Sequence, residues 1–123
     1  MIIYFDSLTG NTKRFVEKVK KERPDWTIQK ISSNLQINQK GHLITYTIGI
    51  GNIPISTTQF VKKNKDFLLS VSSTGNRNWG DNFGLAADKL SKHYNLPIAF
   101  KLELSGTNAD VKSYIEILEK LGE

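Results

Sequence analysis

Residues 2–16 read IIYFDSLTGNTKRFV, and this stretch decides the fold. Its first part, Ile2 to Asp6, is apolar up to the last residue, which predicts a strand buried on both faces of a sheet. A helical pattern of apolar residues begins at Asn11 and extends to about Glu22. A buried strand that leads through a short polar loop into a helix is the repeating unit of parallel sheets.

The rest of the chain repeats this alternation. We expect further strands at residues 26–31, 43–48, 67–72 and 97–104, and further helices at residues 57–64, 81–94 and 108–121. The first, third and fourth strands are continuously apolar, whereas the second and fifth alternate between apolar and polar residues, as edge strands do. This pattern predicts an α/β fold with a five-stranded parallel sheet in the order 2-1-3-4-5 and helices on both faces. Residues 32–41 carry no helical pattern, so the helix after the second strand is expected to be reduced or missing, with an extended connection in its place.

Composition limits the kind of protein. The 123 residues are expected to form a single domain spanning residues 1–123. The chain has no cysteine, which excludes disulfides and cysteine-ligated metals. His42 and His93 lie far apart in sequence and are interpreted as ordinary, partly exposed imidazoles, so no metal site is expected. No apolar run approaches the ~20 residues of a membrane helix, and the apolar start reaches Asp6 without a preceding basic region; we therefore expect a cytoplasmic protein without membrane contact.

The chain carries a net charge of +5, which is compatible with a nucleic-acid or an acidic protein partner. Basic residues cluster at 13–23 and 62–65, both on candidate amphipathic helices, where charge usually marks a solvated face. Proteins that bind single-stranded nucleic acid have aromatic residues interspersed among their basic residues. These two clusters have no such arrangement. Nucleic-acid binding is therefore not expected.

Glycine and small polar residues gather in four segments that each follow a strand, at residues 7–12, 47–54, 74–80 and 105–108. In parallel sheets of the expected order, ligands bind beyond the carboxyl ends of the strands. Turns in general favour these residue types. Four such segments at the same edge nevertheless predict a ligand site rich in backbone amides and hydroxyl groups.

Of these four segments, the loop of residues 7–12 gives the most specific indication of a ligand. It leads into a helix N-terminus, where free amides and the helix dipole favour an anion. Its hydroxyls and asparagine can donate hydrogen bonds, and Gly10 lets a ligand approach the backbone. The Gly-x-x-x-x-Gly-Lys motif of nucleoside triphosphate sites and the Gly-x-Gly-x-x-Gly dinucleotide motif are both absent. The loop therefore predicts a site for a terminal monophosphate such as that of FMN.

The next two loops suit a flat aromatic ligand. Gly49 and Gly51 permit backbone conformations that other residues avoid, so a peptide there can rotate to present either a carbonyl or an amide to a flavin. Trp79 lies among glycines and polar residues, an unusual place for a core side chain, and is predicted to stack on the flavin ring. Backbone amides of residues 75–80 are candidates to hold its pyrimidine edge. Arg77, in the same loop, is expected to face the ring.

Taken together, these motifs resemble the NrdI family, the flavodoxin-like flavoproteins that accompany class Ib ribonucleotide reductases. The resemblance runs along nearly the whole chain. Its most specific parts are DSLTGNT (6–12), ITYT with GIGNIP (44–47 and 49–54), STGNRNWGD (73–81) and FKLELSGT (100–107). The GNRNWG segment is not a general flavodoxin feature. The resemblance implies a flavodoxin-like three-layer sandwich, and the short chain and the missing helix suit this family.

The resemblance also implies a role. Family members bind FMN and, when reduced, pass electrons to dioxygen. The superoxide formed travels to the dimanganese site of the class Ib ribonucleotide reductase small subunit and helps to build its tyrosyl radical cofactor. The flavin is then the catalyst, no side chain acts as acid, base or nucleophile, and an unidentified reductase supplies the electrons.

On this interpretation the cofactor is held by the four loops. Phosphate ligands come from the first loop, the rotating peptide belongs to Gly49, and Ile50, Asn52 and Ile53 shape the edge that dioxygen or the partner approaches. The expected cofactor-binding residues are Ser7, Leu8, Thr9, Gly10, Asn11, Thr12, Thr47, Ile48, Gly49, Ile50, Gly51, Asn52, Thr74, Gly75, Asn76, Asn78, Trp79, Gly80, Leu104, Ser105 and Gly106.

Two alternative functions are open at this point. A general electron-transfer flavodoxin would use the same cofactor site for several acceptors. A phosphoacceptor domain of the same topology would need clustered acidic residues at the strand ends, where only Asp6 is present.

Overall fold

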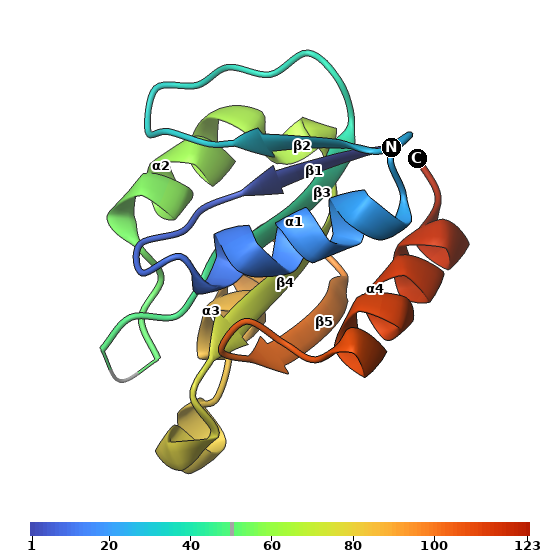
Figure 1. Cartoon of the computed structure of the whole chain (residues 1–123). Helices are drawn as coiled ribbons and strands as arrows, with labels where there is room; N and C mark the ends of the chain where they lie inside the picture. Colours follow the sequence, from blue (N-terminus) through green and yellow to red (C-terminus); the bar gives the residue numbers. More distant parts are fainter. Residues whose placement is uncertain (50) are drawn as a thin grey trace.

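The computed structural model describes residues 1–49 and 51–123. It contains a five-stranded parallel sheet in the order β2-β1-β3-β4-β5 (Figure 1). The strands are β1 (Ile2–Phe5), β2 (Thr27–Lys30), β3 (Gly41–Tyr46), β4 (Leu68–Gly75) and β5 (Ile98–Glu103). The strand order and the parallel pairing expected from the sequence are confirmed.

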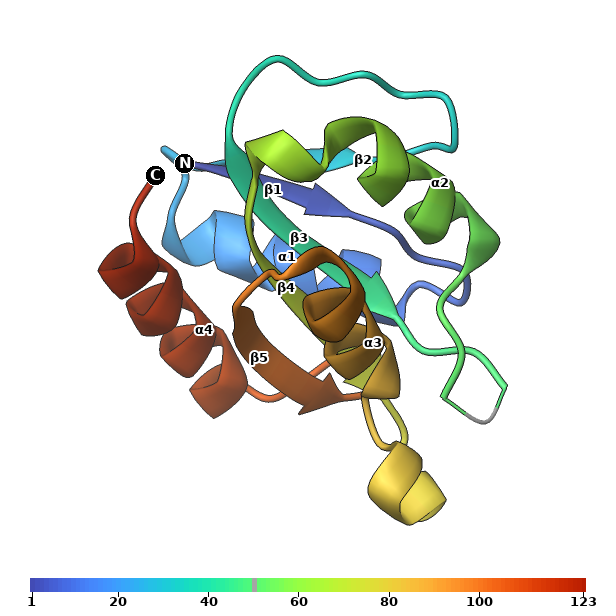
Figure 2. The ribbon, with the colours of Figure 1, turned by 180° about the vertical axis from the view of Figure 1, so that it is seen from behind.

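Helices cover both faces of the sheet. They are α1 (Asn11–Glu22), α2 (Ile55–Asn64), α3 (Leu85–Tyr94) and α4 (Asn108–Leu121), with short 3₁₀ helices η1 (Lys65–Phe67) and η2 (Arg77–Asn82). Helices α1 and α4 lie on the face seen in Figure 1, and α2 and α3 lie on the face seen in Figure 2, which gives the expected three layers. In the described part of the chain, no helix is long and apolar enough to cross a membrane.

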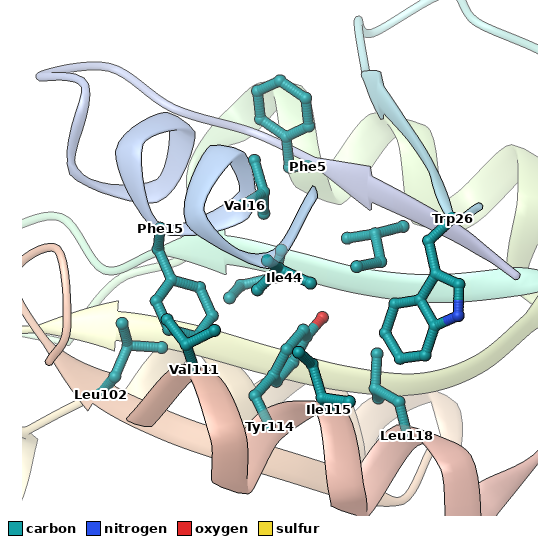
Figure 3. Close-up of a cluster of buried hydrophobic side chains, with 12 residues drawn as sticks. Phe5, Phe15, Val16, Trp26, Ile44, Leu102, Val111, Tyr114, Ile115 and Leu118 are labelled. Carbon is teal, nitrogen blue, oxygen red and sulfur yellow. The ribbon is translucent and has the colours of Figure 1, made fainter. Parts of the chain in front are cut away.

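The burial of the strands follows the apolar patterns in the sequence. Strands β1, β3 and β4 are almost entirely buried, whereas β2 and β5 keep exposed or half-exposed residues along their length. On the α1 and α4 face, the ring of Phe15 meets the ring of Tyr114 edge-on with centroids 5.2 Å apart (Figure 3). Trp26 packs in the same cluster and is only 2% exposed.

The structure corrects the third helix. The sequence pattern predicts a helix over residues 81–94, but α3 begins only at Leu85 because Gly84, at φ 60, precedes it in a left-handed conformation. Residues 77–82 instead form η2, with Gly80 at φ 57 inside it. Phe83, which falls within the predicted helix, lies in the link between η2 and α3 with the Arg77 guanidinium 4.5 Å from its ring centre.

The fourth strand is longer than its apolar pattern indicates. Strand β4 continues past Ser72 to Gly75, because Ser73, Thr74 and Gly75 pair with residues of β5. Thr74 and Gly75 are therefore strand residues at the edge of the site and not loop residues. The other predicted elements begin or end within one or two residues of the observed bounds, and those of α1 and α4 are the same.

The connection between β2 and β3 is extended, as the missing helical pattern predicts. Two of its side chains, Leu35 and Ile37, pack against the core on the α2 and α3 face. Asn64 at the end of α2 holds it in place: its Nδ2 donates to the Leu35 carbonyl at 2.8 Å and its Oδ1 accepts from the Ile37 amide at 2.9 Å. One buried amide therefore fixes a segment that has no helix of its own.

The interpretation of both histidines as partly exposed is wrong for His42, which is fully buried in β3. Its Nε2 lies 2.8 Å from the Gly122 carbonyl and its Nδ1 lies 2.7 Å from the Ser70 hydroxyl. A carbonyl can only accept, so Nε2 carries the proton and Nδ1 accepts from Ser70. Burial lowers the pKa of His42, although the Gly122 hydrogen bond partly opposes this effect.

Candidate functional site

The predicted loops meet at the carboxyl edge of the sheet, around a hollow of about 240 Å³. Residues from the first loop, α1, and the ends of β3, β4 and β5 line it: Ser7, Leu8, Thr9, Asn11, Thr12, Tyr46, Thr47, Ile48, Thr74, Gly75, Asn76, Trp79 and Leu104. All of them except Tyr46 belong to the set predicted from the sequence. The structure therefore brings together segments that are far apart along the chain.

The N-terminus of α1 opens toward this hollow. Gly10 precedes the helix at φ 94 and, as a glycine, supplies no capping side chain, and the first turn holds no acidic residue. The Lys13 amide donates to the Ser7 hydroxyl at 3.3 Å, and the Thr12 and Thr74 hydroxyl oxygens lie 3.5 Å apart. A helix start that has glycine at its N-cap and is surrounded by hydroxyl groups can hold an anion.

Arg14 adds a charge to this loop that the sequence interpretation does not include. Its Nη2 donates to the Asn11 side-chain oxygen at 2.6 Å. A Cβ at Gly10 would come within 2.7 Å of the same guanidinium, so the absence of a side chain lets Arg14 fold back over the loop. Because the Asn11 oxygen is occupied, the Asn11 amide nitrogen can serve as a donor to a ligand.

Asp6 connects the first loop to α2 and was not among the expected cofactor-binding residues. The side chain is 5% exposed, and its Oδ2 accepts from the Ser56 hydroxyl at 2.5 Å and from the Thr57 hydroxyl at 2.8 Å. The Thr45 and Thr57 hydroxyl oxygens lie 2.7 Å apart; because Thr57 donates to Asp6, Thr45 is the donor in this pair. The buried carboxylate thereby orders three hydroxyl groups at the edge of the site.

Two aromatic residues border the hollow. Trp79 lies on η2, which stands away from the sheet in Figure 1, and it is 38% exposed. Tyr46, the last residue of β3, lines the same hollow and is missing from the predicted set. Burial raises the pKa of Tyr46, and the Asp6 carboxylate raises it further, so its hydroxyl is protonated at neutral pH. An aromatic residue at the last position of a central strand is the signal that could have identified it.

The segment after β3 forms a tight turn. The Ile48 and Asn52 backbones exchange two hydrogen bonds, of 2.9 and 2.7 Å. Gly49 is exposed at φ 53, whereas Gly51, at φ 83, is buried against Leu85. Gly49, Gly51 and Asn52 form this turn without lining the hollow, and Ile50 lies outside the described residues.

The segment after β4 carries the remaining predicted residues of that loop. The Asn76 side chain accepts from the Asn78 amide at 2.9 Å and so starts η2. Asn78 and Gly80 are exposed and do not line the hollow. Arg77 does not line it either: its guanidinium lies over Phe83 and its Nε is 4.0 Å from Glu103.

The segment after β5 borders a second hollow of about 440 Å³ beside the first. Leu104 lines both and has φ 54, a left-handed conformation that costs energy for a residue other than glycine. Ser105 and Gly106 line only the second hollow. Gly106 also packs closely on Phe15, where a Cβ would come within 2.7 Å of the ring.

A comparison with protein families matches residues 3–116 to the family described as NrdI flavodoxin-like. The chain belongs to the NrdI family. The resemblance noted in the sequence is thus confirmed, and the match includes all four site loops. Relatives named protein NrdI are 44% identical over 119 residues in Bacillus licheniformis, covering 97% of this chain and 88% of the relative, and 39% identical over 123 residues in Macrococcus caseolyticus, covering 100% and 92%.

Solved structures place this NrdI chain in the flavodoxin fold. A short-chain flavodoxin associated with a bacterial microcompartment superposes with a TM-score of 0.69 at 15% identity, covering 98% of this chain and 94% of the other. A flavodoxin from Streptococcus pneumoniae superposes with a TM-score of 0.66 at 22% identity, covering 98% and 95%. At these identities the likeness shows the fold alone, and the expected flavodoxin-like three-layer sandwich is confirmed.

Proposed function

We propose that this protein binds FMN at the carboxyl edge of its sheet and, when reduced, supplies superoxide for assembly of the dimanganese-tyrosyl radical cofactor of a class Ib ribonucleotide reductase small subunit. Membership of the NrdI family supports the redox role. The observation that carries the cofactor assignment is the start of α1, with glycine at its N-cap, among the hydroxyls of Ser7, Thr9 and Thr12.

The residues at this edge fit a phosphate monoester attached to a flat ring. The donors at the first loop are backbone amides, hydroxyls and the Asn11 amide, with the Arg14 charge beside them. Asp6 lies at the start of the loop, but its carboxylate is turned toward Ser56 and Thr57. Two aromatic side chains, Tyr46 and Trp79, line the same hollow. The hollow therefore offers both donors for a phosphate and aromatic surface for a ring.

When bound and reduced, FMN supplies electrons to dioxygen, which is the chemistry that no side chain here can provide. The protein's own residues bind and orient the cofactor. The first loop fixes the phosphate, Trp79 and Tyr46 enclose the ring, and the Gly49 peptide can present either its carbonyl or its amide to the ring edge. Gly49 stands at φ 53 in an exposed turn, and without a Cβ its backbone can adopt conformations that other residues avoid.

A direct test compares FMN with riboflavin, which has the same ring but no phosphate. We expect FMN to bind at least ~100-fold more tightly, about 2.7 kcal/mol. The Ser7→Ala/Thr12→Val variant should lose affinity for FMN and keep its affinity for riboflavin. Equal affinities of the unaltered chain for the two ligands would remove the phosphate assignment.

A second test addresses the partner. Reduced protein, dioxygen and a manganese-loaded class Ib small subunit should together generate a tyrosyl radical that electron paramagnetic resonance detects. The alternative, a general electron-transfer flavodoxin, predicts slow reaction with dioxygen and no binding to the small subunit. Absence of the radical, despite bound and reducible flavin, would favour that alternative.

A further inference from the structure

A groove of about 640 Å³ lies away from the cofactor hollow, between α2 and α3. Figure 2 shows this face, with both helices in front of the sheet. The groove is lined by Ile53, Thr58, Lys62, Lys89, Lys92, His93 and Tyr94. Ile53, expected from the family resemblance at the edge of the cofactor site, lines this groove and not the hollow. None of the other six residues has a part in the proposed FMN site, so the groove requires a separate explanation.

The walls of the groove are cationic. Lys62 is one turn beyond Thr58 on α2, and Lys89, Lys92 and His93 are spaced three and four residues apart on α3, so each set shares one helix face. Lys62, Lys89 and Lys92 are exposed, and among the described side chains none of them forms an ion pair.

The carboxylates of the two helices do not balance this charge. Helix α2 contains no acidic residue, and α3 contains only Asp88. Asp88 is already paired with Lys101 of β5. The positive potential between the two helices is therefore directed at solvent, where it attracts negatively charged groups.

The floor of the groove is apolar. Ile53 and Tyr94 are partly buried and pack on the core cluster beneath them. His93 lies edge-on to Tyr94 with ring centroids 4.7 Å apart. Apolar surface between rows of lysines suits a segment that carries carboxylates on either side of an apolar side chain. A small inorganic anion would make no use of this floor, and a single-stranded nucleic acid would require open aromatic faces for stacking.

We propose that the groove between α2 and α3 docks an acidic, amphipathic segment of a partner protein. Carboxylates of that segment pair with Lys62, Lys89 and Lys92, and its apolar side chains rest on Ile53 and Tyr94. The Lys89 ammonium also lies 3.4 Å from the Asn52 side-chain oxygen, so the groove adjoins the 48–52 turn. This surface does not depend on bound flavin, and its test does not require the proposed redox activity.

The experiment titrates the full chain with a capped peptide of sequence EDLEELDE and follows the backbone amides by NMR. The comparison peptide EDGEEGDE has the same charge without the leucines. We expect amides around Lys62, Lys89 and Lys92 to shift, with the leucine peptide binding at least ~5-fold more tightly than the glycine peptide because apolar burial adds to charge pairing.

Matched variants separate the groove from overall charge. Lys89→Glu/Lys92→Glu should weaken the leucine peptide at least ~10-fold. Lys112→Glu/Lys120→Glu makes the same change in net charge on exposed positions of α4, at the opposite face, and should leave binding within ~2-fold of the unaltered chain. Circular dichroism confirms that both variants keep the fold.

Three outcomes would overturn the proposal. Equal loss in the two double variants would mean that net charge alone attracts the peptide. Equal binding of the leucine and glycine peptides would mean that the floor plays no part. The same amides could also be titrated with inorganic phosphate or an oligothymidylate at an equal concentration of charge. Shifts larger than those caused by the leucine peptide would identify a site for phosphates or nucleic acid. FMN binding can succeed or fail independently of all three.

Discussion

The Asp6 carboxylate accepts a hydrogen bond of 2.8 Å from the Thr57 hydroxyl, although the two residues are 51 positions apart. Asp6 follows β1 and Thr57 lies in the first turn of α2, so the contact joins the start of the first loop, residues 7–12, to the helix that follows the 48–52 turn. A negative charge at the beginning of a helix is also favourable toward the helix dipole. One buried carboxylate therefore fixes the start of the first loop to α2.

Substitutions at Asp6 should destabilise the fold in a graded way. Asp6→Asn keeps an oxygen that can accept from Ser56 and Thr57 but loses the charge, and it should cost about 1–2 kcal/mol of unfolding free energy. Asp6→Ala leaves both hydroxyls without their acceptor and should cost about 3 kcal/mol. Urea unfolding measures both. The exposed Asp66→Asn serves as control and should change stability by less than about 0.5 kcal/mol. If Asp6→Ala lowers the free energy of unfolding no more than the control does, Asp6 does not stabilise the connection between the first loop and α2.

Stability should fall in mildly acidic solution because of His42. Its pKa is lowered by burial, so the unfolded chain binds a proton more readily than the folded one, and stability declines as the pH falls below the ordinary histidine value of about 6.5. The slope from this residue approaches about 1.4 kcal/mol per pH unit. Two groups also act on the His42 pKa: the Met1 amine lowers it and Glu123 raises it.

Unfolding measured between about pH 7.5 and 5.5 checks this expectation. His42→Gln should flatten the pH dependence, whereas His93→Gln, at an exposed position, should retain it. The pKa of Glu123 is lowered by the Met1 amine, so this carboxylate stays charged throughout that range. A slope equally steep in His42→Gln and in the unaltered chain would assign the effect to another group.

Gly49→Val tests the rotating peptide. Valine is strained at the observed φ of 53, which should hold the peptide in one orientation. We expect FMN to bind as before and the midpoint potential of the step that protonates N5 to fall by about 40 mV, the equivalent of a hydrogen bond of about 1 kcal/mol. The control is Gly122→Val, because Gly122 also has a positive φ but lies at the end of α4, and it should leave the potential unchanged. An unchanged potential in Gly49→Val would remove the assigned role.

Trp79 should contribute to ring binding through stacking. Trp79→Ala is expected to raise the FMN dissociation constant about 3–10-fold, corresponding to 0.5–1.5 kcal/mol of aromatic contact, while Trp79→Phe should retain most of the affinity. Riboflavin affinity should fall by the same factor, because the phosphate is not involved. If Trp79→Ala binds FMN as tightly as the unaltered chain, the side chain serves only as a cover for the link into α3.

The parts of the fold that depend on local pattern were predictable. Strand order followed from which strands are apolar throughout, and the bounds of α1 and α4 followed from their helical periodicity. Nearly all the lining of the hollow could likewise be predicted, because ligand loops in this topology follow the strands in sequence.

What sequence patterns missed depends on contacts between distant segments. His42 sits in an apolar strand, but only the Gly122 carbonyl and the Ser70 hydroxyl make its complete burial tolerable. Similarly, the pattern of apolar residues runs continuously from residue 81, and it is the left-handed Gly84 that delays the start of α3. Arg77 turns toward Phe83, in the link after η2, and toward Glu103, at the end of β5. The sequence of the loop alone does not indicate either contact.

The two tryptophans of the chain lie in different environments, so the intrinsic tryptophan fluorescence can report on two separate events. Trp26 is 2% exposed in the core, whereas Trp79 is 38% exposed and lines the hollow at the carboxyl edge of the sheet. Emission from Trp26 should track unfolding, and emission from Trp79 should be quenched when a yellow ligand enters the hollow. A Trp26→Phe variant would leave a single emitter at the site, so ligand arrival and loss could be timed by stopped flow without attaching a label.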